Sequence, residues 1–178
     1  MKKIFILVTL ITTITLFSQE KAVDVFSAKA GLIGGWISYE KEISPNFTVS
    51  GDVGYEGGLF YNSLMSDDVH YIFTTTLNLT GRYYYNFERR IEKNKNTTHN
   101  AANFVAFQTK FTPNWGSSTS ANNVRVLKTF TVFSKYGFKR NLSNRFNFEF
   151  AFGPGYQWAE KTDGGLTFGL DARFGFNF

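Results

Sequence analysis

Large apolar residues alternate with small or polar ones along this chain, at a period of two residues. The last thirteen residues, LTFGLDARFGFNF, show the pattern most clearly, since every second position from Leu166 to Phe178 is apolar. Successive side chains of an extended strand point to opposite faces, so this period predicts a strand with one oily face and one polar face. A helix would need a period of 3.6 residues.

The same period recurs in four further stretches, at residues 46–60, 69–86, 103–111 and 145–158, and less cleanly at 124–139. The N-terminal stretch 22–43 is the weakest. There Val25, Ile37 and Tyr39 keep the phase, whereas Phe26 and Trp36 break it. Short connections rich in Gly, Asn, Ser and Pro separate the stretches, which predicts an antiparallel all-β fold. Splitting the N-terminal stretch near Ala30 to Gly34 gives about eight strands. The only helical signal is a short turn at FERRIEKNK.

The first residues, MKKIFILVTLITTITLFSQE, have the features of a secretory signal peptide. Lys2 and Lys3 precede an apolar run too short to span a membrane as a helix, and Ser18 offers a small residue for cleavage. We expect residues 1–18 to be a signal peptide and 19–178 to be one domain. Removing Lys2 and Lys3 lowers the formal net charge from +5 to +3, which does not call for nucleic acid. The chain has no cysteine, so disulfides and thiolate metal sites are excluded.

The number of large apolar residues decides which face of the strands is inside. Seven or eight strands with five or six such residues each carry about 40, whereas an eight-stranded barrel is only just wide enough to be filled by side chains. We therefore expect the apolar face to contact lipid and the polar face to fill the lumen of a transmembrane β-barrel. Charges of both signs on the polar face can pair with one another, as buried charges require. This predicted lumen charge network consists of Glu40, Asp52, Glu56, Arg82, Lys110, Lys135, Glu149, Asp171 and Arg173.

The signal peptide, the alternating strands and the final ARFGFNF resemble bacterial outer-membrane β-barrel proteins. The FSQE junction and the stretch from RYYYN to KNKNT further resemble small outer-membrane barrels of Bacteroidota. The resemblance implies location in the cell outer membrane of a Gram-negative envelope and contact with outer-membrane lipid. It also implies that the barrel-assembly machinery and periplasmic chaperones handle the chain during biogenesis. In such proteins the last strand ends in an aromatic residue that the machinery reads, which assigns an assembly signal to Phe174, Phe176 and Phe178.

A C-terminus in the periplasm fixes the predicted side of each connection. Residues 61–68, 113–123 and 159–165 then lie outside, and 44–46, 87–101 and 140–144 lie in the periplasm. Aromatic residues near the ends of strands are typical of a membrane–water interface. We assign this role to Tyr83 and Tyr85, together with the intervening Tyr84, and to Tyr156 and Trp158.

His70 is the one residue that invites a catalytic hypothesis. It follows Ser63, Ser66, Asp67 and Asp68, and together these residues could supply the Ser/His/Asp triad of a hydrolase of outer-membrane lipids. We favour a rim histidine beside an acidic loop, because the serines share a loop and His70 is expected to point into the lumen. Asp67 and Asp68 could also hold calcium or bridge lipopolysaccharide, but we favour a solvated loop. The sequence predicts no cofactor.

A basic segment, ERRIEKNK, carries Arg89, Arg90, Lys93 and Lys95. It is interpreted as a solvated periplasmic loop, or alternatively as a docking patch for an envelope protein. The sequence as a whole predicts a small barrel with a structural or accessory role and no catalytic activity. A narrow channel and a lipid-modifying hydrolase are the alternatives.

Overall fold

The computed structural model describes residues 22–61, 69–120 and 125–178. The predicted signal peptide, and Ser63, Ser66, Asp67 and Asp68, lie outside these residues. Nine strands make up most of the described chain, namely β1 (Val25–Gly31), β2 (Gly34–Ser44), β3 (Phe47–Tyr61), β4 (Val69–Tyr83), β5 (Asn103–Thr112), β6 (Ser117–Thr119), β7 (Thr129–Asn141), β8 (Phe146–Ala159) and β9 (Gly165–Asn177). The prediction of an all-β chain is confirmed.

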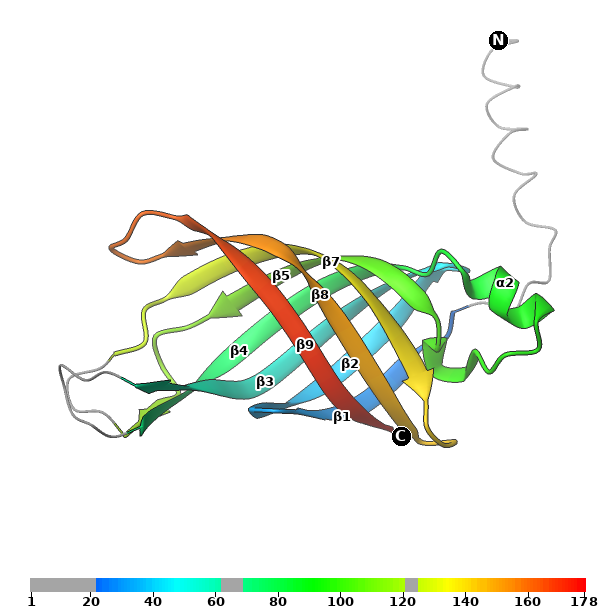
Figure 1. Cartoon of the computed structure of the whole chain (residues 1–178), viewed down its shortest axis with the longest axis horizontal. Coiled ribbons are helices and arrows are strands. Elements are labelled where there is room, and N and C mark those ends of the chain that lie inside the picture. The colour runs from blue at the N-terminus through cyan, green and yellow to red at the C-terminus, as the bar shows by residue number, and fades with distance from the viewer. Residues whose placement is uncertain (1–21, 62–68, 121–124) are drawn as a thin grey trace, which may run out of the picture.

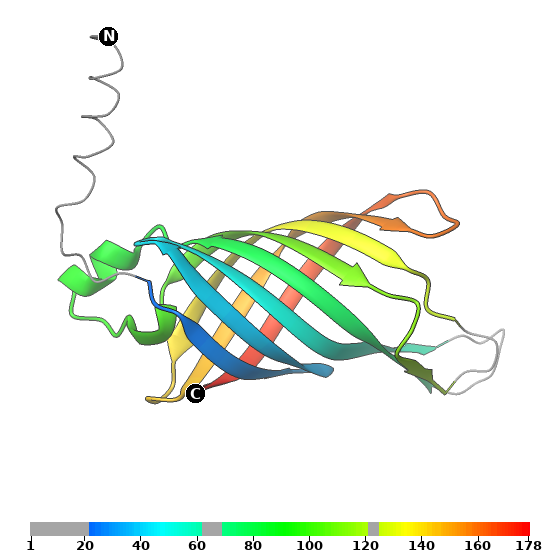
Figure 2. The ribbon, with the colours of Figure 1, turned by 180° about the vertical axis from the view of Figure 1, so that it is seen from behind.

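Eight of these strands form a closed antiparallel ring. Each pairs with the next in chain order, with β7 following β5, and β9 pairs back onto β1. The short β6 adds three residue pairs to β4 outside this ring. Figures 1 and 2 show the strands inclined to the long axis, with the ring closed between the blue and red ends of the chain. The predicted number of strands is therefore confirmed, while β6 was not expected.

The N-terminal stretch forms a hairpin that turns at residues 32–33, as the predicted split near Ala30 to Gly34 requires. The predicted phase is wrong for β1, where Val25 is buried while Phe26 is exposed, but it is correct for β2, where Ile37 and Tyr39 are exposed. The hairpin pairs odd positions of β1 with even positions of β2, so Lys29 lies opposite Trp36. The inward residues therefore have odd numbers in β1 and even numbers in β2.

The two faces of the ring differ in chemistry, as the alternation predicts. Outward positions carry large apolar side chains, such as Phe107, which is 57% exposed, and Phe174, which is 58% exposed. Inward positions are mostly polar, and Ser50, Thr80 and Asn147 are almost completely buried. The ring thus has an apolar outside and a polar inside.

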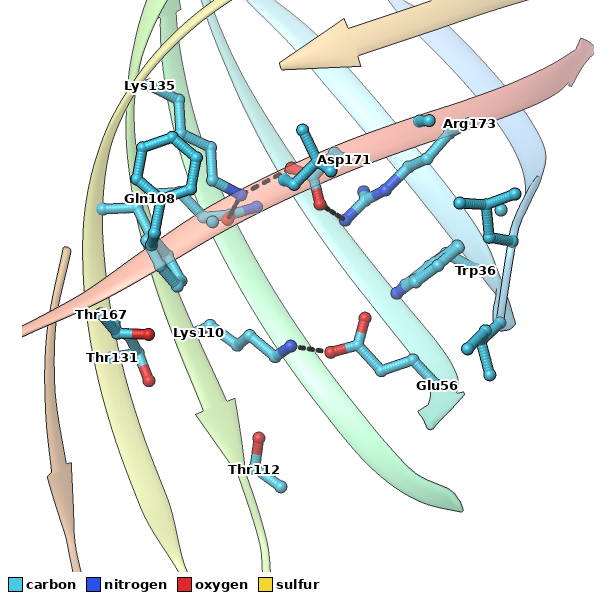
Figure 3. A pocket seen from close by; sticks show the side chains of 18 of the residues that line it. Trp36, Glu56, Gln108, Lys110, Thr112, Thr131, Lys135, Thr167, Asp171 and Arg173 are labelled. Atoms are coloured by element: carbon cyan, nitrogen blue, oxygen red, sulfur yellow. Dashed lines mark hydrogen bonds and ion pairs between the residues drawn. The ribbon is translucent and has the colours of Figure 1, made fainter. Parts of the chain in front are cut away.

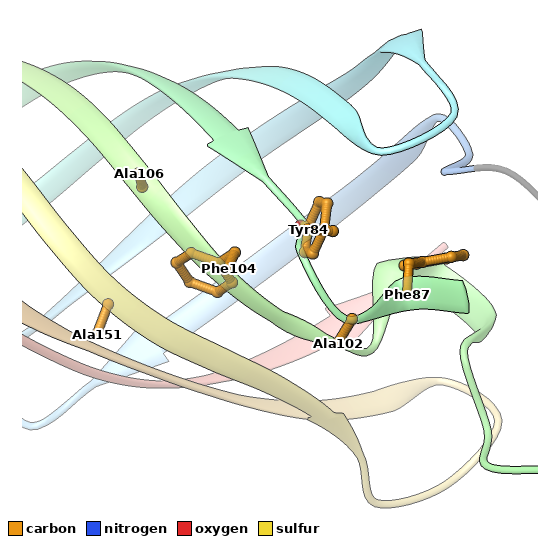
Figure 4. Close-up of a cluster of buried hydrophobic side chains, with 6 residues drawn as sticks. All are labelled: Tyr84, Phe87, Ala102, Phe104, Ala106 and Ala151. Atoms are coloured by element: carbon orange, nitrogen blue, oxygen red, sulfur yellow. The ribbon is translucent and has the colours of Figure 1, made fainter. Parts of the chain in front are cut away.

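One end of the ring is covered by the connection between β4 and β5, residues 84–102. This cap segment contains α2 (Phe87–Glu92) and a 3-10 turn, η1 (Thr98–Asn100). The α2 helix lies where the sequence indicated a short turn. Tyr84 and Phe87 pack with Phe104 in a small apolar cluster just inside the ring (Figure 4). Among the described residues, no helix is long and apolar enough to cross a membrane.

One prediction for this connection is wrong. Tyr84 was assigned with Tyr83 and Tyr85 to the membrane–water interface, yet its side chain is completely buried. Tyr84 has the same parity as Arg82, so the alternation of β4 continues beyond Tyr83 and directs Tyr84 into the opening of the ring. The ERRIEKNK segment is mostly exposed, whereas Phe87 and Asn100 on either side of it are buried against the end of the ring.

Candidate functional site

The charged side chains inside the ring fall into two groups. The α2-side cluster lies next to the cap segment and comprises Lys29, Glu40, Asp52, Arg82, Lys139 and Glu149. The cavity cluster lies toward the opposite end and comprises Glu56, Lys110, Lys135, Asp171 and Arg173. The alternation of each strand places these side chains inward, and their pairing joins strands far apart in the sequence.

Glu40 is the most heavily hydrogen-bonded member of the α2-side cluster. Its Oε1 accepts hydrogen bonds from the hydroxyls of Thr48, at 2.8 Å, and Tyr84, at 2.5 Å. The same oxygen accepts one from Asn100 Nδ2 at 3.0 Å, and Oε2 pairs with Lys139 Nζ at 3.0 Å. Because Tyr84 and Asn100 belong to the cap segment, this one carboxylate fastens the cap to the strands.

Glu149 is the second centre of the α2-side cluster. Its Oε2 lies 3.2 Å from Lys29 Nζ, and its Oε1 lies 3.1 Å from Nη2 of Arg82. Arg82 also donates to Ser50 Oγ at 2.7 Å and lies 3.9 Å from Glu40. The Arg82 guanidinium therefore bridges the two carboxylates, and β1, β4 and β8 are linked across the interior.

Asp52 completes the charge balance of this cluster without direct contacts. Its side chain is buried, and neither carboxylate oxygen has a hydrogen-bond partner among the described residues. It lies within electrostatic range of Lys29 and Arg82. With Asp52 included, the cluster contains three cationic and three acidic side chains.

The position of Tyr84 beside Glu40 governs its ionisation. Burial raises the pKa of the Tyr84 phenol well above its usual value of 10, and the negative charge of Glu40 raises it further. The phenol therefore stays protonated and continues to donate its hydrogen bond through the physiological range.

The cavity cluster surrounds a cavity of about 480 Å³. Asp171 is shared by two cations, since its Oδ2 lies 2.5 Å from Lys135 Nζ and its Oδ1 lies 3.0 Å from Nη2 of Arg173. Lys110 forms an ion pair with Glu56 on another side of the cavity (Figure 3). This cluster therefore has three cations and two carboxylates.

Aromatic rings form part of the cavity wall. The guanidinium carbon of Arg173 lies 4.3 Å from the centroid of the Trp36 ring, and Lys135 Nζ lies 4.6 Å from that of Phe133. The Trp36 ring occupies space left by two glycines: a Cβ atom on Gly54 would collide with it, and one on Gly31 would lie 3.0 Å from it. The backbone thus holds Trp36 in a fixed position inside the ring.

The structure brings together most of the predicted lumen charge network. All nine predicted residues lie inside the ring, and eight form ion pairs; Asp52 is the exception. Lys29, Lys139 and Tyr84 were missed. Lys139 has the same parity as Lys135, so the alternation could have found it. The change of phase in the N-terminal hairpin concealed Lys29.

The predicted aromatic groups occupy both ends of the ring. Tyr83 and Tyr85 are exposed at the α2 end, where the Tyr85 and Tyr136 hydroxyls lie 2.7 Å apart. Tyr156 and Trp158 are exposed toward the other end, with ring centroids 4.7 Å apart. In the proposed assembly signal, Phe178 is 72% exposed, Phe174 is exposed and Phe176 is half-buried. The Phe178 ring contacts those of Phe26 and Phe176.

The geometry of the described residues does not support the catalytic alternative. His70 Nδ1 lies 3.4 Å from Ser120 Oγ in the segment after β6, while the serines and aspartates considered with it lie outside the described residues. Within residues 22–61, 69–120 and 125–178, no three His, Cys, Asp or Glu side chains are grouped as metal ligands.

The basic residues of α2 and the turn after it lie on the outside of the cap segment. Arg89, Lys93 and Lys95 are exposed, and Arg90 donates a hydrogen bond to the Asn96 carbonyl at 2.8 Å. These side chains face away from the charge clusters and are available to solvent. Comparison of the chain with protein-family models, with curated proteins and with solved structures found no match.

Proposed function

We propose that this chain is a small integral outer-membrane β-barrel with a structural or accessory role in the bacterial envelope, without catalytic activity. One observation carries the proposal: a closed ring of eight strands exposes large apolar side chains around its outside and keeps most of the charged side chains of its strands inside. Such an arrangement is stable in lipid, which solvates the apolar face, and satisfies every backbone group through strand pairing.

The extent of the exposed apolar surface supports a lipid environment. Soluble proteins rarely expose a contiguous apolar patch larger than a few hundred Å². Here Leu79, Phe107 and Phe168 are each more than half exposed, on strands from different parts of the ring. Seven of the eight ring strands contain 10 to 15 residues, and about 9–11 suffice for a tilted strand to cross a bilayer.

The aromatic residues near the two ends support the same proposal. Tyrosine and tryptophan are enriched where a membrane meets water, because their rings are apolar and their polar atoms can remain hydrated. Tyr83 and Tyr85 at one end, and Tyr156 and Trp158 toward the other, are exposed and would contribute to two such girdles.

The polar interior favours an accessory role over a channel. The α2-side cluster fills the interior next to the cap segment with ion-paired side chains, and the cap segment covers that end through Tyr84 and Asn100. Conduction would require displacing hydrogen-bonded charges whose separation is costly.

Cell fractionation combined with single-channel recording tests this proposal. The protein should fractionate with the outer membrane and migrate faster on a gel before heating than after, as a detergent-resistant closed barrel does. Recovery as a soluble periplasmic protein would overturn the proposal. In planar bilayers we expect little or no conductance, and steady ion-selective currents would instead support the channel alternative.

The assembly signal can be tested with a matched pair of aromatic residues. Deleting Phe178 should lower the amount of folded protein in the outer membrane, while refolding into detergent stays nearly intact. Phe168→Ala, at an exposed aromatic of β9 on the same face, should leave the amount in the membrane nearly unchanged. Equal behaviour of both variants in both assays would show that Phe178 contributes packing alone.

A further inference from the structure

We propose that the cavity bounded by the cavity cluster binds a small organic monocarboxylate with a flat apolar body. The residues that would bind it are Lys135 and Arg173, which share the Asp171 carboxylate, and the neighbouring indole of Trp36 (Figure 3). The proposal concerns a ligand and does not depend on the membrane location proposed above.

The charge of the cavity is not balanced by its own residues. Lys110 is matched by Glu56, but Asp171 is the one described carboxylate that forms ion pairs with Lys135 and Arg173. Glu149 acts on both cations at longer range, but it is already paired with Lys29 and Arg82. The side chains of Lys135 and Arg173 are each only 4% exposed, so water compensates this charge poorly. One buried positive charge therefore remains without a carboxylate, and a buried charge is stabilised by a paired, hydrogen-bonded counter-ion. A singly charged anion supplies that counter-ion.

An unused hydrogen-bond donor points into the same space. The Trp36 side chain is 7% exposed, and its Nε1 has no hydrogen-bond partner among the described residues. Figure 3 shows this nitrogen directed toward the space between the Lys110–Glu56 pair and Arg173. Indole nitrogen is a donor only, so the missing partner is an acceptor. A carboxylate oxygen bound there would accept from Trp36 and face the cations.

The size and walls of the cavity fit a ligand with an apolar body. Its volume of about 480 Å³ lies within the range of small-molecule sites. The rings of Trp36 and Phe133 provide flat apolar walls, and Thr112, Thr131 and Gln108 provide polar groups around them. This combination of apolar walls with few convergent polar groups is typical of small-molecule sites.

The balance of one excess charge distinguishes a carboxylate from other ligands. A cation would add to the positive excess. A doubly charged phosphate would leave one negative charge in excess in the cavity. An uncharged amide of the same shape could contact the aromatic walls but would not neutralise the excess charge.

Calorimetric titration of the full protein, refolded in detergent micelles, tests the proposal with benzoate as the probe. Benzamide, which has the same shape without the charge, is the matched ligand control, and inorganic phosphate tests the charge preference. We expect saturable binding of benzoate, at least about tenfold tighter than that of benzamide or phosphate. Absence of saturable benzoate binding, or equal affinity for benzoate and benzamide, would overturn the proposal.

Two variants locate the binding site. Lys135→Gln removes the excess charge while leaving Asp171 paired with Arg173, and should weaken benzoate binding by about tenfold. Lys93→Gln removes the same charge from the exposed cap segment and should leave the affinity within about twofold. Equal affinities of these two variants would place binding elsewhere and contradict the proposal.

If Lys135→Gln fails to fold, the variant Trp36→Phe provides a second test of the binding site. It retains an aromatic wall and removes only the indole donor, so benzoate should bind several-fold more weakly. Folding of each variant is checked by its heat-modifiable migration. Unchanged affinity in folded Trp36→Phe would show that the indole does not contact the ligand and would overturn the assignment.

Discussion

The two charge clusters lie inside the same ring and arise from the same alternation, yet they differ in how completely they are satisfied. In the α2-side cluster, Glu40 accepts four hydrogen bonds, and the ion-paired side chains are at most 3% exposed. In the cavity cluster, Asp171 serves two cations, and the Lys110 side chain is 30% exposed. Satisfied buried charges hold a structure together, whereas an excess charge beside a cavity leaves capacity for a ligand.

The cap segment accounts for much of this difference. Tyr84 and Asn100 reach from it to Glu40 and close one end of the ring. The lining of the cavity also includes an end connection, the β1–β2 turn, but Leu32 and Ile33 there have apolar side chains that cannot hydrogen-bond to the cavity cluster. One end therefore contributes stability and the other offers a binding site.

Breaking the centre of the α2-side cluster should have the largest effect. Glu40→Gln removes the negative charge that pairs with Lys139 and faces Arg82, leaving buried cations short of a partner. We expect the free energy of unfolding to fall by about 3–5 kcal/mol, measured by urea unfolding in detergent micelles. Glu56→Gln, at the partly exposed pair of the cavity cluster, should cost about 1 kcal/mol or less. Equal losses would abolish the distinction between the clusters.

Removing the hydroxyl of Tyr84 should have the next largest effect. Tyr84→Phe deletes a buried hydrogen bond to a carboxylate while keeping the ring that packs with Phe87 and Phe104. We expect a loss of about 1.5–3 kcal/mol. The control Tyr85→Phe alters an exposed hydroxyl and should change stability by no more than about 0.5 kcal/mol. A neutral Tyr84→Phe would show that the cap is not fastened through Glu40.

The difference in stability between the wild type and Tyr84→Phe should depend on pH. Burial beside Glu40 raises the pKa of folded Tyr84 well above 10, its usual value in the unfolded chain. The stabilising contribution is therefore complete below pH 10 and is lost as pH rises toward the folded pKa. Between pH 10 and 11, the stability advantage of the wild type over Tyr84→Phe should shrink by up to about 1.4 kcal/mol. A constant advantage across this interval would contradict the assignment.

Asp52 should give the smallest effect among the buried charges. Its carboxylate makes no hydrogen bond within the described chain, so Asp52→Asn loses only long-range attraction and gains from removing a buried charge. We expect a change of about 1 kcal/mol or less in urea unfolding. A loss as large as that of Glu40→Gln would identify Asp52 as a principal counter-ion.

The sequence predicted the ring well because a two-residue period assigns every residue of a strand to one of its two faces. Once Phe107 and Gln108 are assigned to opposite faces of a strand, the remaining positions of that strand follow. Counting apolar residues then predicted which face points inward. The nine predicted charges lie inside for that reason.

The cap and the N-terminal hairpin could not be predicted in the same way. Asn100 lies in an irregular connection, where no period relates a residue to the interior, whereas Tyr84 has the parity of Arg82 and the alternation could have placed it inside. Lys29 was missed because the hairpin turn reverses the parity of inward positions, and the length of the turn was not evident from the sequence between Ala30 and Gly35. The pairing of cations with particular carboxylates likewise depends on strand register, which the alternation alone does not fix.

Quenching of single tryptophans by brominated lipid acyl chains tests the central claim most directly. Two proteins are compared in lipid vesicles, both with Trp115 and Trp158 replaced by Phe. One retains Trp36 inside the ring, and the other carries Trp36→Phe with Phe107→Trp on the outer face. If the apolar face contacts lipid and the charged face lies within, brominated chains should quench the tryptophan at position 107 strongly and Trp36 weakly. Strong quenching of Trp36 with little at position 107, or none at either, would contradict the account.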